Sequence, residues 1–575
     1  MELVNLKIDG ISVSVPKDYT IFEAAKMLDI RIPTLCHHPA LPPEGACRVC
    51  VVEVKGMRNL VASCTMPVAA GMEVLTGTKQ IVHARKKIVE LLISNHPRDC
   101  LACTRNGRCE LQDLASDLGI RNIPYSFNKP SHLKDESNPC LRRNPDKCIL
   151  CGRCIRMCST VQSVGVYSFT NRGVRATVSP AFFQNLSQSE CTYCGQCLKV
   201  CPTGALSIKS NIDDVVNALA DPDKIVMVQT APSVRVGLSE GLGGQAGDIV
   251  TGKMVAALRR LGFAKVFDTN WSADLTIMEE STELLQRIEN SGVLPMMTSC
   301  CSAWVNFVEL QYPDLIPHLS TAKSPQAMLG AMLKTFYAQK QNIDPEKIVS
   351  VSIMPCTAKK FEASRPELHD SGYTDVDYVL TTTELAQLVR QHTINFSTLP
   401  EEKFDDFMGE GSGAGTIFGA SGGVMEAALR TAHEVVTGKQ LPGLELLEVR
   451  GMEGIKEATI TMGDQDFKVV VGQTLDNARK ICELVRDGNP HKWSFIEIMA
   501  CPGGCVNGGG QPLSLDGVIP ERRQQALYKN DRQLPIRKSH ENKEVLAAYD
   551  FLGEPNGHTA HELLHTSYSK QNRDS

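Results

Sequence analysis

The cysteines of this chain are concentrated and regularly spaced, in a pattern that suits metal binding. The sequence has 575 residues and 22 cysteines, of which 16 fall within the first 201 residues. Disulfide frameworks belong to small secreted domains, whereas this long chain begins with MELVNLKIDG and shows no export signal. We therefore expect reduced thiolates that act as metal ligands.

The most specific pattern is a doubled run of cysteines with the spacing C-x2-C-x2-C-x3-C, which is the spacing of two-cluster ferredoxins. In that fold, the fourth cysteine of each run binds the cluster of the other run. The first predicted [4Fe-4S] cluster is bound by Cys148, Cys151, Cys154 and Cys201. The second is bound by Cys158, Cys191, Cys194 and Cys197. Gly152 and Gly195 lie in the loops, where backbone must approach sulfide closely.

Two further groups of candidate ligands precede this run. The first comprises Cys36, Cys47, Cys50 and Cys64. It is a variant of the plant-type [2Fe-2S] pattern, and the alternative of structural zinc would usually show two short C-x2-C units. The second comprises His96, Cys100, Cys103 and Cys109. One imidazole and three thiolates suit either zinc or a [4Fe-4S] cluster, and the neighbouring redox centres favour the cluster. Cys140 has no partner group and is expected not to be a ligand.

The elements that position the N-terminal groups follow from the residue pattern. Apolar residues alternate over 4–8 and 11–15 around Asp9-Gly10, which indicates a hairpin. A helix over 21–28 with Thr20 as its cap, and strands over 51–54 and 71–75, complete a small mixed sheet of the β-grasp type. An amphipathic helix is expected over 81–94, and the polar, proline-containing stretch 129–147 is interpreted as a linker.

From about residue 224 the pattern changes to strands that alternate with helices, which indicates an α/β domain with a largely parallel sheet. Strands are expected over 224–228, 266–268, 295–298 and 348–354, and helices over 254–261, 273–289 and 384–391. Ligands of such sheets bind beyond the carboxyl ends of the strands. Apolar runs end there at Cys300-Cys301, at Cys356 and at Cys501 with Cys505. Five thiols therefore face one cleft, and because a cubane needs four, one is spare.

Three segments that carry these thiols resemble the signatures of [FeFe]-hydrogenases. They are TSCCSAW, MPCTAKKFE and EIMACPGGCVNGGGQP, and the segments FGASGGVMEAALR and RKSHEN…AHELLH are similar to that family too. The resemblance covers essentially the whole chain. The N-terminal array resembles that of the larger clostridial enzymes, of the catalytic subunit of NAD(P)-linked electron-bifurcating complexes, and of the large complex I subunit. The sequence departs from the family at Ser302-Ala303, where Pro-Gly is usual, which leaves the local loop shape and oxygen sensitivity open.

The resemblance implies an H-cluster, with a [4Fe-4S] part and a two-iron subsite that carries CO, cyanide and azadithiolate and is inserted by maturation proteins. The implied ligands of the [4Fe-4S] part are Cys301, Cys356, Cys501 and Cys505, with Cys505 as the bridge to the subsite. The positions that line the subsite are Pro232, Ser233, Gln326, Met354 and Met499. Lys359 could hold a cyanide by a charge-assisted hydrogen bond. From the residues alone, both methionines read as core and Lys359 as exposed.

The spare thiol, Cys300, could relay protons between the cofactor and a carboxylate. Glu280 and Glu283 share one face of the helix expected over 273–289. The resemblance implies a path through Cys300, Glu280, Ser320, Glu283 and Arg287 to bulk water. Without the resemblance, such a pair of charges would read as a solvated helix face.

The predicted protein is a multidomain chain of the α+β and α/β classes. The expected domains are a [2Fe-2S] domain over 1–79, a [4Fe-4S] domain with one histidine and three cysteine ligands over 80–128, a two-cluster ferredoxin-like domain over 138–210, and an H-cluster domain with a helical tail over 211–575. The expected function is the reversible oxidation of H2 and reduction of protons, with electrons relayed through the N-terminal clusters. Expected partners are ferredoxin and flavin- or NAD(P)-binding Fe–S subunits of a bifurcating complex.

Two alternatives stand beside this function: a monomeric ferredoxin-dependent hydrogenase, and a non-catalytic electron-transfer, assembly or sensor protein of the same fold. Cys300 and the glutamate pair favour catalysis, because an electron carrier needs neither. The net charge of -5 gives no reason to expect nucleic acid or a membrane, and a cytoplasmic protein is expected.

Three further features are interpreted as structural. His561-Glu562-Leu563-Leu564-His565 has the zincin spacing but leaves no room for a third ligand. Gly247-x4-Gly252-Lys253 lacks the Ser or Thr of a phosphate loop, so NAD chemistry would need another subunit. Cys482 lies in a helical pattern and reads as core.

Overall fold

The computed structural model describes residues 2–126, 131–439, 441, 443–462, 465–513 and 518–573. The end of the expected second domain (127–128) and the first two residues of the expected linker, Lys129 and Pro130, lie outside the described residues. The chain divides into two units. The first comprises Met1–Val161, Gly165–Ser189 and Cys197–Ser207, and the second comprises Gln162–Val164, Glu190–Gln196 and Ile208–Ser575.

The first unit begins with a five-stranded sheet in the order β2-β1-β5-β3-β4. Its strands are β1 (Leu3–Ile8), β2 (Ile11–Pro16), β3 (Val51–Val54), β4 (Val61–Ala62) and β5 (Glu73–Leu75). The predicted hairpin is confirmed, because Ile8 pairs with Ile11 and both turn residues have positive φ, 50° at Asp9 and 84° at Gly10. Helix α1 (Ile21–Met27) begins at Thr20, whose side chain forms a capping box as expected. This is the β-grasp domain.

The rest of the first unit is built from short elements around the remaining cysteines. They are α2 (Lys79–Ser94), α3 (Glu110–Asp117), α4 (Arg153–Arg156), α5 (Gln196–Val200), β6 (Leu141–Arg143), β7 (Ser168–Thr170), β8 (Thr177–Ser179) and β9 (Leu206–Ile208). The expected linker is wrong at its end, because β6 lies inside it and pairs with β9. The amide oxygen of Asn138 accepts the N–H groups of Cys140 and Leu141 at 2.8 and 2.9 Å, so this polar segment is held in place.

The second unit contains a parallel four-stranded sheet in the order β11-β10-β13-β14. Its strands are β10 (Ile225–Thr230), β11 (Lys265–Asp268), β13 (Ile348–Met354) and β14 (Tyr378–Thr381). Helices cover both faces of this sheet, because successive side chains of β10 point to opposite faces and both sets are apolar. Val226 and Val228 pack in one core with α8 (Thr251–Arg260), whereas Met227 packs in another with α9 (Thr269–Glu289). The predicted parallel α/β sheet is confirmed.

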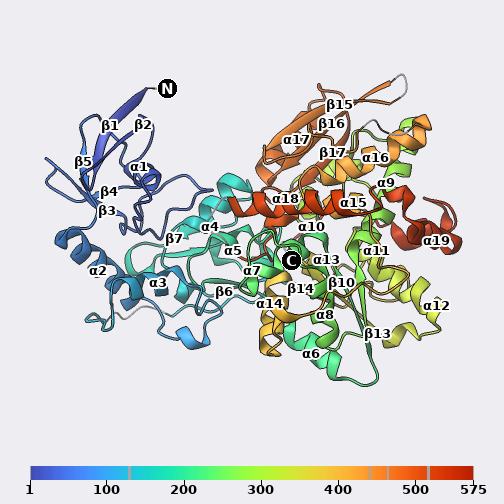
Figure 1. Ribbon diagram of the computed structural model, residues 1–575, viewed down its shortest axis with the longest axis horizontal. Coiled ribbons are helices and arrows are strands. Elements are labelled where there is room, and N and C mark those ends of the chain that lie inside the picture. Colours follow the sequence, from blue (N-terminus) through green and yellow to red (C-terminus); the bar gives the residue numbers. More distant parts are fainter. Residues whose placement is uncertain are drawn as a thin grey trace. The chain divides into compact units, whose positions relative to one another are not determined.

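A second sheet of this unit has the order β12-β17-β16-β15 (Figure 1). Its strands are β12 (Met296–Met297), β15 (Ile455–Met462), β16 (Gln465–Gln473) and β17 (Trp493–Met499). Helix α9 packs against both sheets: Trp271 and Leu275 join the core of the first, and Ala273 and Ile277 join that of the second. An amphipathic surface helix has one exposed polar face, whereas α9 has no exposed face over most of its length.

The other helices of the second unit surround these sheets. They are α6 (Ile212–Ala220), α7 (Leu238–Gly241), α10 (Ser302–Gln311), α11 (Pro325–Met332), α12 (Ala338–Gln341), α13 (Ala358–Glu362), α14 (Thr382–Gln391), α15 (Gly413–Ile417), α16 (Gly423–Thr437), α17 (Leu475–Arg486), α18 (Val518–Gln533), α19 (Lys543–Leu552) and α20 (His558–Leu564). Gly252-Lys253 lies in the first turn of α8, as its interpretation as a helix start requires, and Cys482 is buried in α17. Within the described ranges, no helix is both long and apolar enough to cross a membrane.

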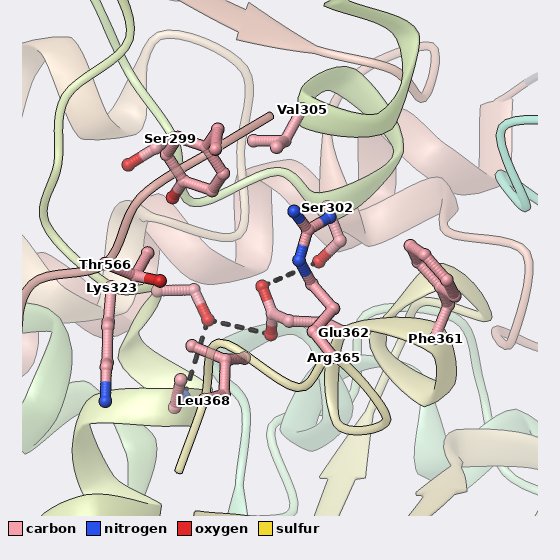
Figure 2. Close-up of a pocket in the computed structure, with 12 residues that line it drawn as sticks. Ser299, Ser302, Val305, Lys323, Phe361, Glu362, Arg365, Leu368 and Thr566 are labelled. Atoms are coloured by element: carbon pink, nitrogen blue, oxygen red, sulfur yellow. Dashed lines mark hydrogen bonds between the residues drawn. The ribbon is translucent and has the colours of Figure 1, made fainter. Parts of the chain in front are cut away.

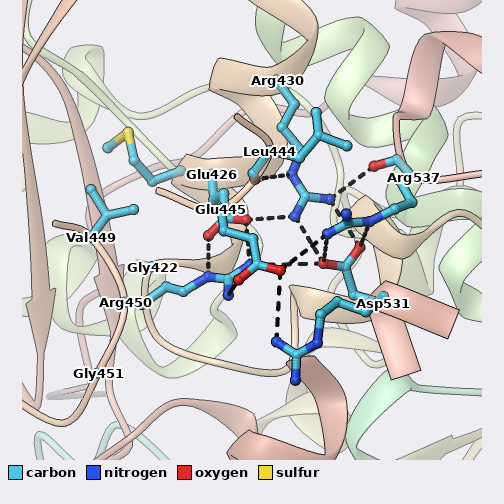
Figure 3. A network of polar contacts seen from close by, with 12 residues as sticks. Gly422, Glu426, Arg430, Leu444, Glu445, Val449, Arg450, Gly451, Asp531 and Arg537 are labelled. Carbon is cyan, nitrogen blue, oxygen red and sulfur yellow. Dashed lines mark hydrogen bonds and ion pairs between the residues drawn. The ribbon is translucent and has the colours of Figure 1, made fainter. Parts of the chain in front are cut away.

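A buried network of ion pairs joins α16 to α18 (Figure 3). The Arg430 guanidinium donates to both oxygens of Asp531, at 2.9 and 3.0 Å, and to Glu426 at 2.5 Å. All three side chains are fully buried. Arg450 adds two hydrogen bonds to Glu426, and Arg537 adds two to Asp531. Each buried carboxylate is therefore matched by more than one guanidinium, which offsets its desolvation.

Replacing Arg430 with methionine should destabilise the second unit by about 3–5 kcal/mol, because two buried carboxylates would lose their shared partner. The measurement is the unfolding midpoint in denaturant. Arg532→Met is the matched control, since Arg532 lies on α18 with a half-exposed side chain 3.7 Å from Glu445 and should change stability by less than about 1 kcal/mol. Equal losses in the two variants would contradict the role of the network.

Candidate active site

Three strands of the second unit end at one cavity. β12 is followed by Cys300 and Cys301, β13 by Cys356, and β17 by Cys501. The cavity is lined by Ala231, Pro232, Ser233, Thr269, Ala273, Cys300, Cys301, Pro325, Gln326, Met354, Pro355, Cys356, Lys359, Phe418, Gly419, Met499 and Cys505. The predicted meeting of thiols at the carboxyl ends of the strands is thus what the structure shows.

Four of these thiols crowd one another, as the donor set of a [4Fe-4S] cluster must. Burial raises the pKa of Cys501 well above its ordinary value, and Cys356, Cys301 and Cys505 raise it further. Burial, followed by the charge of Cys301, raises the pKa of Cys356 to about 12. Thiolates at such short range repel each other, and only a bound cation would stabilise all four together. The residues present therefore fit an iron–sulfur cubane.

The rest of the cavity wall fits the two-iron group. All five positions that the family resemblance implies for it, Pro232, Ser233, Gln326, Met354 and Met499, line the cavity. Both methionines are also buried in the cores of the two sheets, so their interpretation as core packing holds at the same time. The wall is largely apolar, and Lys359 supplies a cation to it. An anionic group would be held there with little competition from water.

Lys359 is buried, and its interpretation as an exposed side chain is wrong. Its ammonium donates to the two oxygens of Glu362 at 2.8 and 2.9 Å and to the carbonyl of Cys300 at 3.1 Å. Burial alone would lower the pKa of Lys359, but Glu362, Cys300 and Cys356 together raise it above its ordinary value. The group is therefore a fixed cation at neutral pH. Glu362 was not among the predicted site residues, although its i,i+3 spacing from Lys359 could have indicated the ion pair.

The implied proton path occupies buried positions on and beside α9. The hydroxyl of Ser320 donates to Glu283 at 2.7 Å, and Arg287 donates to the other oxygen of Glu283 at 2.6 Å. The guanidinium of Arg287 also donates to the carbonyl of Leu319 at 2.7 Å and is partly exposed. The interpretation of Glu280 and Glu283 as a solvated face is wrong, because α9 packs against both sheets and both carboxylates are buried.

Glu280 lies between this chain of contacts and the cavity. Burial, and then the charge of Glu283, raise the pKa of Glu280 to about 8 from an ordinary value of 4.5. Burial raises the pKa of the Cys300 thiol, and the charge of Glu280 raises it further. A carboxyl group with a pKa near neutrality can both accept and release a proton under working conditions.

The loop of the second cysteine run packs closely against the H-cluster segment. Gly195 has a φ of +71°, and a Cβ there would lie 2.4 Å from the hydroxyl of Thr357. A Cβ at Gly509 would lie 2.8 Å from the carbonyl of Cys194. Burial raises the pKa of Cys194 to about 11, and Cys191 and Cys301 raise it too, so these thiols lie within electrostatic reach of one another. Close backbone approach at the Gly508–Gly510 run is confirmed.

The first unit brings the four [2Fe-2S] candidates together. Hydrogen bonds with Cys47 and Cys64 lower the pKa of Cys36 to about 2. A hydrogen bond with Cys64, whose sulfur lies 3.3 Å away, lowers the pKa of Cys50 to about 6. The same hydrogen bonds raise the pKa values of Cys47 and Cys64, so the four thiols form one group in mutual contact, as the ligands of a cluster must.

The remaining predicted ligand sets differ in where their members lie. Cys148, Cys151, Cys154 and Cys201 line one cavity of the first unit together, which is the interleaved set expected of one cubane. Of the other set, Cys158 and Cys197 belong to the first unit, and Cys191 and Cys194 to the second. In the group of one histidine and three cysteines, Nδ1 of His96 lies 2.8 Å from the carbonyl of Pro97. Burial raises the pKa of Cys109, with a further contribution from Cys103.

The His–Glu–x–x–His segment serves the fold. Nε2 of His565 lies 3.1 Å from Glu279, and Nδ1 lies 2.8 Å from the hydroxyl of Thr321. The rings of His561 and His565 stack at 4.7 Å. Both nitrogens of His565 are thus engaged with protein groups, so a zincin site is not formed.

Comparison with known families agrees with this geometry. The iron only hydrogenase large subunit, C-terminal domain, matches residues 224–509, and the iron hydrogenase small subunit matches 519–571. A 2Fe-2S iron-sulfur cluster binding domain matches 1–79, the NADH-ubiquinone oxidoreductase-G iron-sulfur binding region matches 85–124, and a 4Fe-4S dicluster domain matches 147–205. The chain belongs to the [FeFe]-hydrogenase family, and it is an oxidoreductase that acts on H2.

Two curated relatives cover nearly the whole chain, and a solved structure covers its larger part. The NADP-reducing hydrogenase subunit HndD of Solidesulfovibrio fructosivorans is 50% identical, with 100% of both chains covered. Iron hydrogenase 1 of Clostridium pasteurianum is 41% identical over 98% of this chain and 99% of its own. A solved structure of a variant of apo [FeFe]-hydrogenase HydA1 from Chlamydomonas reinhardtii is 46% identical, with a TM-score of 0.57, over 63% of this chain and 99% of that one.

Replacing Glu280 with glutamine should remove a loss of folding stability that grows as the pH rises. Between pH about 4.5 and about 8, the folded state keeps a proton on Glu280 that the unfolded state has released, so stability falls as the pH rises. The unfolding midpoint of Glu280→Gln relative to the native chain should therefore increase from pH about 5 to about 8. Glu289→Gln, an exposed position on the same helix, is the control. A difference that does not change with pH would contradict the assignment.

Proposed function

We propose that this chain catalyses the reversible reaction 2H⁺ + 2e⁻ ⇌ H2 as the catalytic subunit of an NAD(P)-linked, electron-bifurcating complex. The observation that carries catalysis is the fifth thiol. Cys300 lines the cavity together with three candidate ligands, Cys301, Cys356 and Cys505, and lies within electrostatic reach of buried Glu280. An electron carrier or assembly factor would need neither group. When bound, the H-cluster supplies the redox chemistry that joins two electrons and two protons.

The proposed ligands of the five metal centres are those that the sequence assigns. Cys301, Cys356, Cys501 and Cys505 would hold the [4Fe-4S] part of the H-cluster, with Cys505 also facing the two-iron group. Cys36, Cys47, Cys50 and Cys64 would hold the [2Fe-2S] cluster, and His96, Cys100, Cys103 and Cys109 the adjacent [4Fe-4S] cluster. The two ferredoxin-like clusters would take Cys148, Cys151, Cys154 and Cys201, and Cys158, Cys191, Cys194 and Cys197.

In the proposed proton path, each residue moves a proton at a defined atom. Sγ of Cys300 exchanges a proton with the cavity on one side and with the carboxylate of Glu280 on the other. The hydroxyl of Ser320 passes the proton on to Glu283, to which it is hydrogen-bonded at 2.7 Å. Arg287 holds Glu283 at 2.6 Å and borders the solvent, so it orients the last carboxylate. The raised pKa of Glu280 supports exchange in both directions.

The proposed entry of electrons is through the loop of Cys191 and Cys194. Within the second unit this loop packs against the Gly508–Gly510 run, with a Cβ at Gly509 only 2.8 Å from the Cys194 carbonyl. Cys194 in turn raises the pKa of Cys501, after the effects of burial and of the other H-cluster thiols. Such proximity suits electron transfer between two adjacent cubanes.

The proposed partners follow from the relatives. HndD, by its name, is a subunit of an NADP-reducing hydrogenase, and the second N-terminal match is to a region of an NADH-ubiquinone oxidoreductase. We assign to this chain a cytoplasmic complex with flavin- and NAD(P)-binding Fe–S subunits, with ferredoxin as a second electron partner and maturation proteins that insert the two-iron group. A monomeric, ferredoxin-dependent hydrogenase is the alternative, and the match to iron hydrogenase 1 of Clostridium pasteurianum over 98% of this chain is compatible with it.

Replacing Cys300 with serine or alanine should lower H2 turnover by about 10²–10⁴-fold while every cluster is retained, since only the proton relay is removed. Turnover is measured anaerobically with reduced methyl viologen after loading with the synthetic two-iron cofactor. Cys482→Ala removes a buried thiol far along the chain in α17 and should turn over as the native enzyme does. Native rates in a fully loaded Cys300 variant would refute the relay.

The partner assignment predicts that the isolated chain, although active with methyl viologen, does not reduce NAD⁺ or NADP⁺ with H2. Reduction should appear when the chain is purified together with its native partner subunits. The measurement is H2-dependent absorbance of the reduced nicotinamide, with and without oxidised ferredoxin. A dependence on both acceptors supports a bifurcating complex, whereas H2 uptake by the isolated chain with ferredoxin as sole acceptor, and no co-purifying subunits, supports the monomer.

A further inference from the structure

Glu362 is a buried carboxylate near the cavity whose hydrogen-bond donors come from three different elements. Besides the ammonium of Lys359, it accepts hydrogen bonds from the hydroxyl of Ser302, at 2.9 Å to Oε1, and from the hydroxyl of Ser324, at 2.9 Å to Oε2. The amide of Gln326 adds a hydrogen bond of 2.9 Å to Oε2. The four partners and Glu362 are all at least nine-tenths buried. Glu362 thus joins the first turns of α10, α11 and α13.

The ion pair of Lys359 with Glu362 separates two cavities. Lys359 and Gln326 line the cavity of the candidate cluster ligands. Glu362 and Ser302 line a second cavity, of about 20 Å³, whose wall carries both polar and apolar side chains (Figure 2). The position of the ammonium relative to the cluster cavity therefore depends on how strongly Glu362 attracts it from the other side.

All three N–H donors of the Lys359 ammonium are engaged in hydrogen bonds within the protein. An ammonium has three N–H donors, and those of Lys359 meet Oε1 and Oε2 of Glu362 and the carbonyl of Cys300. A carboxylate offers about four lone-pair sites, and Glu362 receives five contacts. Ser302 is the partner that shares Oε1 with Lys359 among the described residues. Each neutral donor occupies a lone pair of Glu362 that would otherwise accept a hydrogen bond from the ammonium of Lys359.

We propose that Glu362 is a positioning residue that fixes Lys359 and Gln326 at the wall of the two-iron site, and that the hydroxyl of Ser302 weakens its hold on Lys359. One N–H of Lys359 can then turn toward an anionic ligand in the cavity. This inference rests on the proposed role of Lys359 toward the two-iron group. Ser302 occupies one of the two positions at which this sequence departs from the family signature, so the adjustment belongs to this chain.

The test is infrared spectroscopy of the protein loaded with the two-iron cofactor, because the cyanide bands report the hydrogen bond from Lys359. Ser302→Ala should shift these bands, since the ammonium is drawn closer to Glu362. Ser302→Thr keeps the hydroxyl and should restore the native positions. Glu362→Gln removes the competing charge and should shift the bands in the opposite direction from Ser302→Ala. Ser364→Ala, an exposed hydroxyl bonded to the Phe361 carbonyl, should change nothing.

The outcomes separate this inference from the proposed function. Native cyanide bands in Ser302→Ala, or shifts of the same sign in Ser302→Ala and Glu362→Gln, overturn it even if H2 turnover is retained. Absence of H2 turnover in the loaded native chain would instead refute the proposed function. If Glu362→Gln takes up no cofactor, the comparison of Ser302→Ala with Ser302→Thr decides alone. The electron paramagnetic resonance of the [4Fe-4S] part should be unchanged in both Ser302 variants, which excludes a displaced Cys301.

Discussion

The crowding of four buried thiols at one point is the constraint on which the catalytic unit depends. Burial and neighbouring thiols raise the pKa values of Cys356, Cys501 and Cys505, so the polypeptide alone disfavours the ionised set. The iron of a cluster reverses this preference, because it stabilises the thiolates that repel one another. Two sheets are needed to deliver these ligands, since β12 and β17 belong to one and β13 to the other. The cavity therefore lies where the carboxyl ends of both sheets meet.

The same arrangement explains how a proton path can run through a protein core. A helix that packs against two sheets must be buried on most of its surface, and α9 carries Glu280 and Glu283 into that interior. Glu283 is satisfied there by Ser320 and Arg287. Glu280 has only weak compensation, and its pKa rises accordingly. In the proposed proton path, the outer carboxylate is therefore held by hydrogen bonds, whereas the inner carboxyl keeps a pKa close to neutrality.

Local patterns in the sequence were sufficient for many of the elements, whereas the assignment of the cluster ligands stays a prediction. Asp9-Gly10 predicted a hairpin, and the residues of β13 were expected over the range that the structure shows. Burial was not predictable in the same way. From the residues alone, Lys359 reads as exposed and the face of Glu280 as solvated. Both are buried by segments distant in the sequence, the loop of Cys300 for Lys359 and the two sheets for α9, although Glu362, the ion-pair partner of Lys359, lies on the same helix. Asp531 lies 101 residues from Arg430 along the chain, so no local spacing indicates that pair. The linker prediction failed because a polar segment with two prolines can still form a short strand when a side chain such as Asn138 satisfies its backbone.

The division of the chain has a consequence for how it can be truncated. Residues 162–164 and 190–196 fold with the catalytic unit, although they lie inside the segment that carries the ferredoxin-like cysteines. The polypeptide therefore passes back and forth between the units before it enters the catalytic sheets. No single cut in the chain separates the two units with all their residues. A truncation that removes 190–196 would leave the Gly508–Gly510 run without the backbone that packs against it.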